Sequence, residues 1–171
     1  FIFIFLIKSK NLLKNYRILT VLFQQVIIIG FFILLIDSSS PFNYVFPAPI
    51  EGLGLNPILQ DPALAIHPPI LYLGYVGSSI IFSSVLAATS LNYISKTWVV
   101  HIKSWILLSW VFLTIGILLG SIWAYYELGW GGFWFWDPVE NVSLMPWLAL
   151  TTLLHCILVL EKRSSLSTWV I

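Results

Sequence analysis

The stretch SWILLSWVFLTIGILLGSIWAYY (Ser104–Tyr126) contains 23 residues without one charged side chain. A helix needs about 20 such residues to cross the ~30 Å hydrocarbon core of a bilayer. Three further uncharged stretches are nearly as long, namely Ile18–Ile36, Ile70–Leu91 and Val142–Leu160. Because backbone polar groups in lipid must bond within their own segment, all four stretches are predicted to be transmembrane helices.

The composition supports the same class. Of the 171 residues, 59% are hydrophobic and only 9% are charged, whereas a soluble domain carries about 25% charged residues. The opening FIFIFLI, residues 1–7, is too short to span a bilayer and is interpreted as the end of a truncated apolar segment. We therefore expect an all-α polytopic membrane protein with about four transmembrane helices, a truncated N-terminal one, and two outer-face loops.

The expected segments follow from the ends of the uncharged stretches. They are 1–17, an apolar end and basic inner loop; 18–36, a helix; 37–69, an outer loop rich in Pro and Gly; 70–91, a helix; 92–103, an inner loop; 104–126, a helix; 127–141, a Trp-rich outer loop; 142–160, a helix; and 161–171, an inner tail.

Charge sorting predicts the orientation. With the loops numbered alternately, all eight Lys and Arg residues fall on one side and six of the seven acidic residues on the other. The basic side is then the matrix or cytoplasm, and the outer loops face the intermembrane space or periplasm. The Ile-, Phe- and Asn-rich composition suggests an AT-rich organellar gene, and so favours the mitochondrial inner membrane over a bacterial plasma membrane.

The second outer loop, ELGWGGFWFWDPVEN (127–141), is unusually aromatic. One interpretation is a belt of rings at headgroup level. The other is a platform for a large flat ligand, on which rings stack while indole N–H groups donate hydrogen bonds and glycines let the backbone approach. Haem fits that description, and its propionates would need indole or backbone N–H donors because no Lys or Arg lies on this side. The predicted contact residues are Trp130, Gly131, Gly132, Phe133, Trp134, Trp136 and Asp137.

Asp137 also has a structural interpretation. Asp137 at the N-cap, Pro138 at the first helical position and Glu140 at the third form a capping box that would open the last helix. This role does not exclude a ligand contact.

Two histidines are candidate iron ligands. His67 precedes Pro68, which suits the first position of a helix, so His67 is expected at or beside an outer helix cap, either as an interfacial residue or as an axial ligand. His155 lies within the last uncharged stretch, where it either bonds to a neighbouring helix or ligates a haem held between helices. The two lie at different membrane levels, so each would need a second ligand from outside this chain. His101 is interpreted as a solvated or headgroup-level residue of the inner loop, and Cys156 as a small apolar one.

Three blocks resemble the CcmF family of cytochrome c-type haem lyases, part of a wider haem-handling superfamily with a Trp-rich WWD domain. They are Glu51–Gly77, with its EGLGLNP and HPP motifs; Phe112–Leu148, with WGGFWFWDPVEN; and Leu153–Arg163, with LLHC. The resemblance implies the N-terminal part of such a lyase, consistent with a split mitochondrial subunit. The family usually has Trp at the position of Phe133.

The resemblance implies the roles of the two histidines. His67 would be an axial ligand of haem presented at the outer loop, and His155 a ligand of a permanent membrane haem b. The implied partners are a complementary C-terminal lyase chain with the second His ligands, a CcmE-like haem chaperone, apocytochrome c and CcmH-like thiol-reducing subunits. A lipid bilayer is expected as partner and nucleic acid is not.

The implied reaction joins haem to the CxxCH thiols of apocytochrome c. No catalytic nucleophile is expected in this chain. Two alternatives stay open: a haem transport or delivery subunit without ligation chemistry, and a haem-free structural subunit of a larger complex.

Overall fold

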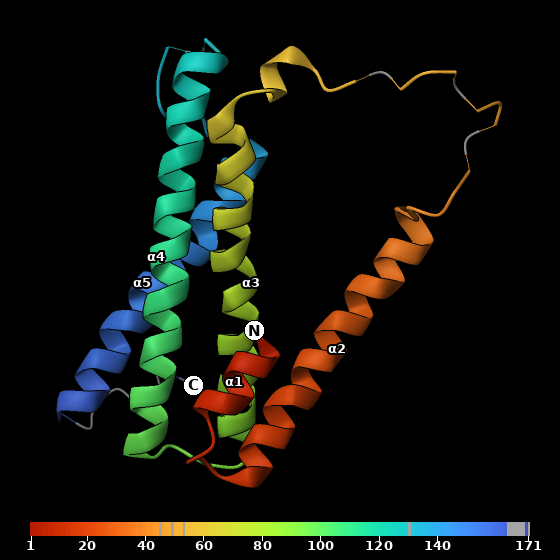
Figure 1. Cartoon of the computed structure of the whole chain (residues 1–171). Helices are drawn as coiled ribbons and strands as arrows, with labels where there is room; N and C mark the ends of the chain where they lie inside the picture. Colours follow the sequence, from red (N-terminus) through yellow and green to blue (C-terminus); the bar gives the residue numbers. More distant parts are fainter. Residues whose placement is uncertain (45, 49, 53, 130, 164–169, 171) are drawn as a thin grey trace.

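The computed structural model describes residues 1–44, 46–48, 50–52, 54–129, 131–163 and 170, and the regular elements among these residues are helices (Figure 1). The elements follow in the order α1 (Ile2–Lys8), α2 (Lys14–Ser38), the short 3-10 helix η1 (Pro57–Leu59), α3 (Pro62–Ser90), α4 (Lys96–Glu127) and α5 (Pro138–Arg163). Helices α2 to α5 are long and apolar enough to cross a membrane. The predicted class, with four spans and a short helix before them, is confirmed.

Helix α3 begins earlier than predicted. Asp61 is its N-cap, and one carboxylate oxygen accepts two backbone N–H groups of the first turn at 2.7 and 3.3 Å. Pro62 takes the first helical position, where a missing N–H is tolerated. The expectation that Pro68 opens this helix is therefore wrong, and His67 lies in the second turn. Residues 62–69 are also uncharged, and the predicted start lay too late because Pro68 was assigned to the first helical position.

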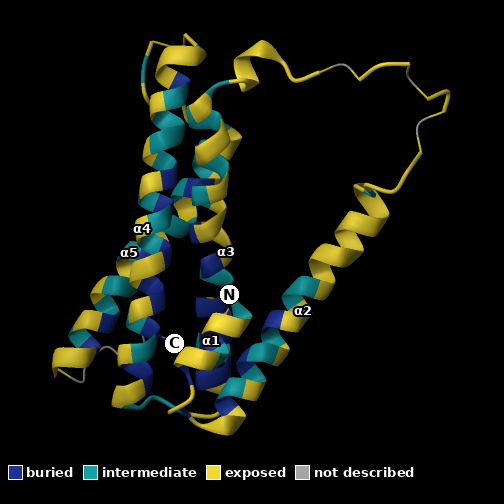
Figure 2. Ribbon diagram, viewed as in Figure 1, coloured by how far each residue is buried: buried dark blue, intermediate teal, exposed yellow. Residues whose placement is uncertain are grey.

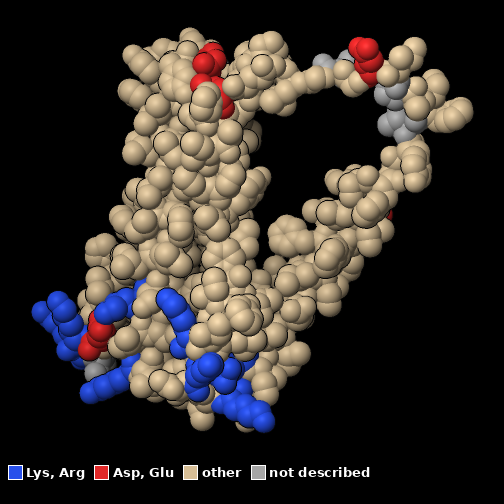
Figure 3. Space-filling view, viewed as in Figure 1, with Lys and Arg blue, Asp and Glu red and all other residues tan. Residues whose placement is uncertain are grey.

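The long helices alternate in direction, so their basic ends gather at the lower end in Figures 1 and 3. Lys14 opens α2 and Lys96 opens α4, while Lys162 and Arg163 close α5. The acidic cap Asp61 lies at the opposite end of α3. This arrangement agrees with the predicted charge sorting, which assigns the lower end to the inner side.

Glycines let α3 and α4 approach closely along their length. A Cβ added to Gly116 of α4 would lie 2.6 Å from the Cα of Leu71 in α3. One added to Gly74 of α3 would lie 2.5 Å from the backbone nitrogen of Leu113 in α4. Such small residues are typical of helix contacts in membranes, where van der Waals packing drives association.

Polar side chains join α2 to α3 over the inner half of α2. The Tyr16 hydroxyl lies 2.5 Å from Ser84 Oγ. Two turns further along α2, the Gln24 amide donates to Ser79 Oγ at 2.9 Å and accepts from Ser83 Oγ at 3.1 Å. These bonds satisfy groups that would otherwise be unpaired in an apolar surrounding.

Two tryptophan–threonine pairs hold α4 against α5. The Trp110 indole donates to Thr151 Oγ1 at 2.8 Å, and the Trp147 indole donates to Thr114 Oγ1 at 2.8 Å. Each Thr hydroxyl in turn donates to the carbonyl of the Trp four residues earlier in its own helix, at 2.7 Å. The two indoles stack with centroids 6.0 Å apart. We refer to these four residues as the Trp–Thr clasp.

Helix α1 packs against the basic end of α4, where Figure 2 shows many buried residues. Phe5 is buried and its ring lies 6.3 Å from that of Trp105 in α4. It also contacts the His101 ring edge-on at 5.5 Å. His101 Nε2 is buried and has no hydrogen-bond partner among the described residues. The expectation of a solvated His101 is therefore wrong, because α1 folds back over it.

Candidate functional site

The Trp-rich loop turns sharply between α4 and α5. Gly129 and Gly131 have φ values of +63° and +77°, which favour glycine. Trp136 has φ +57°, a conformation that is uncommon for a bulky side chain and is held by the structure around it. Trp130 lies outside the described residues. No heavy atom would lie within 4 Å of a Cβ at Gly131, so its backbone is open to approach.

A capping box anchors the end of the loop, as predicted. The Glu140 backbone N–H donates to Asp137 Oδ1 at 2.6 Å, and the Asp137 N–H donates to Glu140 Oε2 at 3.3 Å. The same Glu140 oxygen accepts the Phe135 N–H at 2.8 Å. The Asn141 amide donates to the Trp136 carbonyl at 2.9 Å. These bonds fix the backbone that carries the aromatic rings.

The aromatic rings of the loop divide into a half-buried ring and exposed rings. Trp134 is half-buried and meets Trp136 edge-to-face, with centroids 5.9 Å apart. Trp136 is 68% exposed and Phe133 is 56% exposed. Phe133 stacks on Tyr125 at the end of α4, with centroids 4.4 Å apart. The loop thus offers exposed ring surface outside and one indole inside.

His67 belongs to α3, and its ring packs against the backbone of α4. Its Nδ1 lies 2.7 Å from the Gly116 carbonyl oxygen. A carbonyl only accepts, so Nδ1 is the nitrogen that donates here, and Nε2 is the ring nitrogen not engaged by this bond. A Cβ at Gly120 would lie 2.5 Å from the ring, which therefore rests directly on the helix backbone. This is the arrangement in which a histidine is oriented as an iron ligand.

A cavity of about 90 Å³ joins His67 to the base of the loop. Its wall includes Trp134, Asp137 and Ser143, which come from the loop and from α5. The predicted residues His67, Trp134 and Asp137 are thus brought together, whereas Phe133 and Trp136 lie outside this wall.

Two residues of the cavity wall have a buried indole N–H group with no acceptor among the described residues. They are Trp123 of α4 and Trp134. Buried donors are nearly always paired in folded proteins. Two orphaned donors beside an oriented imidazole therefore indicate a place for an acidic or carbonyl group of a ligand, or for water.

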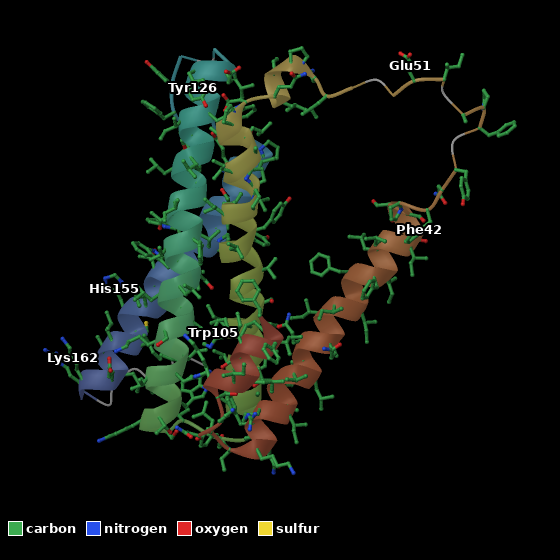
Figure 4. The ribbon with its side chains drawn as sticks, in the orientation of Figure 1. Phe42, Glu51, Trp105, Tyr126, His155 and Lys162 are labelled. Carbon is green, nitrogen blue, oxygen red and sulfur yellow. The ribbon has the colours of Figure 1, made fainter. Side chains whose placement is uncertain are left out.

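Several residues of this region were not predicted. Trp123 and Ser143 lie on helices in the sequence-based prediction and had no motif of their own. Gly116 and Gly120 form a G-x-x-x-G pair, a known signal for close helix approach. The Tyr126 hydroxyl donates to Asp61 Oδ1 at 2.7 Å and ties the outer end of α4 to the cap of α3 (Figure 4).

His155 belongs to a different part of the molecule. It lies 12 residues after the cavity residue Ser143, roughly 18 Å along α5. Its side chain is exposed and projects away from α4 (Figure 4), and its Nδ1 lies 2.8 Å from the Thr151 carbonyl. The structure therefore separates the two candidate histidines and leaves His155 on a face that no described helix covers.

The comparisons with known proteins agree with this architecture. The sequence model of the cytochrome C assembly protein family matches residues 1–171. The chain is 53% identical to the cytochrome c-type biogenesis protein CycK of Bradyrhizobium diazoefficiens over 163 residues, 95% of this chain and 25% of that protein. It is 51% identical to CcmF of Escherichia coli over 142 residues, 82% of this chain and 22% of that protein.

The solved structure of a cytochrome c haem lyase, CcmF, has the same fold. It superposes with a TM-score of 0.79 at 33% identity, over 99% of this chain and 27% of that one. The chain spans about a quarter of the length of these relatives. It is a membrane protein similar to CcmF and CycK, and it belongs to the cytochrome C assembly protein family.

Proposed function

We propose that the chain binds haem at its outer face as part of a cytochrome c haem lyase. The observation that carries the proposal is the site below the loop, where His67 is oriented by the Gly116 carbonyl beside two buried, unpaired indole N–H groups. The solved structure with the same fold is named as a haem lyase. The sequence resemblance described above supports the same role.

His67 would act as the axial ligand through Nε2, because Nδ1 is already engaged. The indoles of Trp123 and Trp134 would donate hydrogen bonds to propionates, which no Lys or Arg on this side can pair. A cavity of about 90 Å³ is far smaller than the roughly 300–1,000 Å³ of ligand pockets. The macrocycle would therefore lie across the outer loop, on exposed rings such as Trp136, with only an edge in the cavity.

The chemistry comes from the bound haem and from the cytochrome. Haem supplies two vinyl groups, and each CxxCH thiol adds its sulfur and its hydrogen across one of them to form a thioether. This addition needs no oxidant and no nucleophile from the present chain. Cys156 is half-buried within α5 and well away from the loop in sequence. The role of this chain would be to hold haem, orient it and exclude competing ligands.

His155 would ligate a resident haem b within the membrane. An ionisable side chain on a membrane-facing surface is costly, so its presence favours a functional partner. The second ligand would come from a further helix, either of the same longer polypeptide or of a complementary chain. The other proposed partners are a CcmE-like haem chaperone, apocytochrome c and CcmH-like subunits.

The loop would open to the compartment opposite the basic end of the molecule. That compartment is the periplasm in bacteria and the intermembrane space in mitochondria. The named relatives are bacterial. The mitochondrial inner membrane remains a proposal that rests on the composition alone.

The test is a cavity variant at the proposed ligand. The complete assembly is purified with His67→Gly, loaded by the haem chaperone, and its low-spin haem signal is recorded by electron paramagnetic resonance. We expect the signal of the loaded haem to disappear and to return when free imidazole is added. His101→Ala, at the opposite end of α4, is the matched control. An unchanged signal in His67→Gly would contradict the proposal.

The same preparation distinguishes a haem lyase from a haem transport subunit. A lyase attaches haem covalently to apocytochrome c, and the product keeps its haem after acid extraction in acetone. A delivery subunit releases haem that stays extractable. If neither the wild type nor any variant binds haem or attaches it to apocytochrome c, the haem-free structural subunit is favoured.

A further inference from the structure

A second and larger cavity lies at the inner end, far from the Trp-rich loop. Its volume is about 520 Å³, and it lies between α1, the connection to α2 and the first turns of α4. None of its lining residues belongs to the proposed haem sites. Its wall combines two cations with an apolar surface, and this combination indicates the class of ligand.

The cationic part of the wall is Lys8, at the end of α1, and Lys96, at the start of α4. Neither forms an ion pair within the described residues, whereas Lys103 outside the cavity is paired with Glu161 at 2.8 Å. The Ser95 hydroxyl caps only the Trp98 N–H. The first N–H groups of α4 therefore add to the positive potential at this end of the cavity.

One row of wall residues runs along a single face of α4, from the cation Lys96 to the apolar Leu108. Lys96, Val100, Ser104 and Leu108 follow each other at four-residue spacing, so they lie on one side of the helix. The row is roughly 18 Å long and leads from a charge at the membrane surface into the hydrocarbon. That length is close to one leaflet, about half of the ~30 Å core. Ile4 of α1 lines the same cavity from the other side.

We propose that this cavity binds an anionic phospholipid of the inner leaflet. The phosphate would lie between Lys8 and Lys96 at the start of α4, and an acyl chain would cover Val100 and Leu108. Basic pockets between helices on the inner side suit anionic head groups. A free phosphate ion would leave the apolar wall exposed, and an apolar helix would leave both ammonium groups without an anion. The bound lipid would stabilise the packing of α1 against α4.

The test measures bound lipid on the complete protein. The protein is reconstituted in phosphatidylcholine discs with and without phosphatidylglycerol. It is then released from the discs, and its mass with any bound lipid is measured by native mass spectrometry. We expect a phosphatidylglycerol adduct in the wild type and a roughly tenfold lower occupancy in the double variant Lys8→Gln/Lys96→Gln. The matched control is Lys10→Gln/Lys14→Gln, which removes the same charge at the same end but outside the cavity wall.

Equal loss of the adduct in the control would show that the lipid responds to net charge and would overturn the proposal. A second measurement does not depend on how the variants fold. Phosphatidylglycerol with a photoreactive acyl chain is incorporated with the wild type, and the labelled peptides are sequenced. Labelling of the Val100–Leu108 segment supports the cavity. Labelling confined to other helices, or blocking of the cavity by another segment of the longer protein, overturns it.

Discussion

Among single residues, the contact between His67 and Gly120 governs the outer site. We expect Gly120→Ala to force the imidazole away from the Gly116 carbonyl, because the new Cβ would lie 2.5 Å from the ring. Overpacking of this kind lowers the free energy of unfolding by about 1–3 kcal/mol. The measurement is equilibrium unfolding in detergent, together with the low-spin haem signal of the loaded assembly.

Gly30 provides the matched control for that substitution. It lies on α2, and a Cβ there would have no neighbour within 4 Å. Alanine is the better helix former, so Gly30→Ala should leave stability unchanged or raise it slightly. Equal losses in the two variants would mean that the Gly120 effect does not come from the histidine.

Asp137 allows its two possible roles to be separated. Asn accepts the same cap hydrogen bond as Asp, so Asp137→Asn should keep the helix start and the haem signal. Asp137→Ala removes the acceptor and should cost about 1 kcal/mol of unfolding free energy in the same assay. If Asp137→Asn loses haem while it stays folded, the carboxylate contacts the ligand in addition to capping α5.

Between elements, the hydrogen bonds of the Trp–Thr clasp should stabilise the packing of α5 against α4. We expect Trp110→Phe to weaken the pair by about 0.6 kcal/mol, a typical value for one hydrogen bond between membrane helices. A double-mutant cycle with Thr151→Val measures the coupling through unfolding equilibria in mixed micelles. A coupling of zero would show that the Trp110–Thr151 hydrogen bond does not stabilise the contact between the two helices.

Much of the element layout could be predicted because the bilayer imposes a simple rule. Uncharged length indicated the four spans, and charge sorting indicated their direction. The start of α3 was missed because Pro68 was assigned to the first helical position, whereas Pro62 occupies it and Pro68 lies inside the helix. The capping box at Asp137 was predicted correctly because all of its partners are local in sequence.

The candidate site could be predicted only in part. His67 and Trp134 were chosen for their chemistry, and the structure brings both to one cavity. The roles of Gly116 and Gly120 depend on how α3 packs against α4, which no local pattern specifies. The split of the loop into exposed rings and a buried indole also depends on neighbouring helices.

For the molecule as a whole, the proposed function requires the two ends to face different compartments. Single cysteines in a Cys156→Ser background, at Val139 beside the loop and at Lys10 at the basic end, can be labelled with a membrane-impermeant maleimide. We expect Val139→Cys to react from the outer side of intact cells or mitoplasts, and Lys10→Cys only in inverted vesicles. Reaction of both from one side would rule out this topology.

Large surfaces of the molecule are apolar and uncovered. The outer half of α2 carries exposed Phe31, Phe32 and Ile33, and Figure 2 shows it as largely exposed. His155 lies on another uncovered face. Since the relatives are about four times as long, these faces are where lipid or further helices would pack.

The proposed function places two haem sites at separate membrane levels of one chain. The decisive measurement is the reduced-minus-oxidised spectrum of the complete assembly, recorded before and after loading by the chaperone, for wild type, His67→Ala and His155→Ala. We predict that His155→Ala loses the resident b-type signal seen before loading. We also predict that His67→Ala keeps this resident signal and fails to gain the loaded one. A b-type signal that survives in His155→Ala, or a loaded signal that survives in His67→Ala, would contradict the two-site proposal.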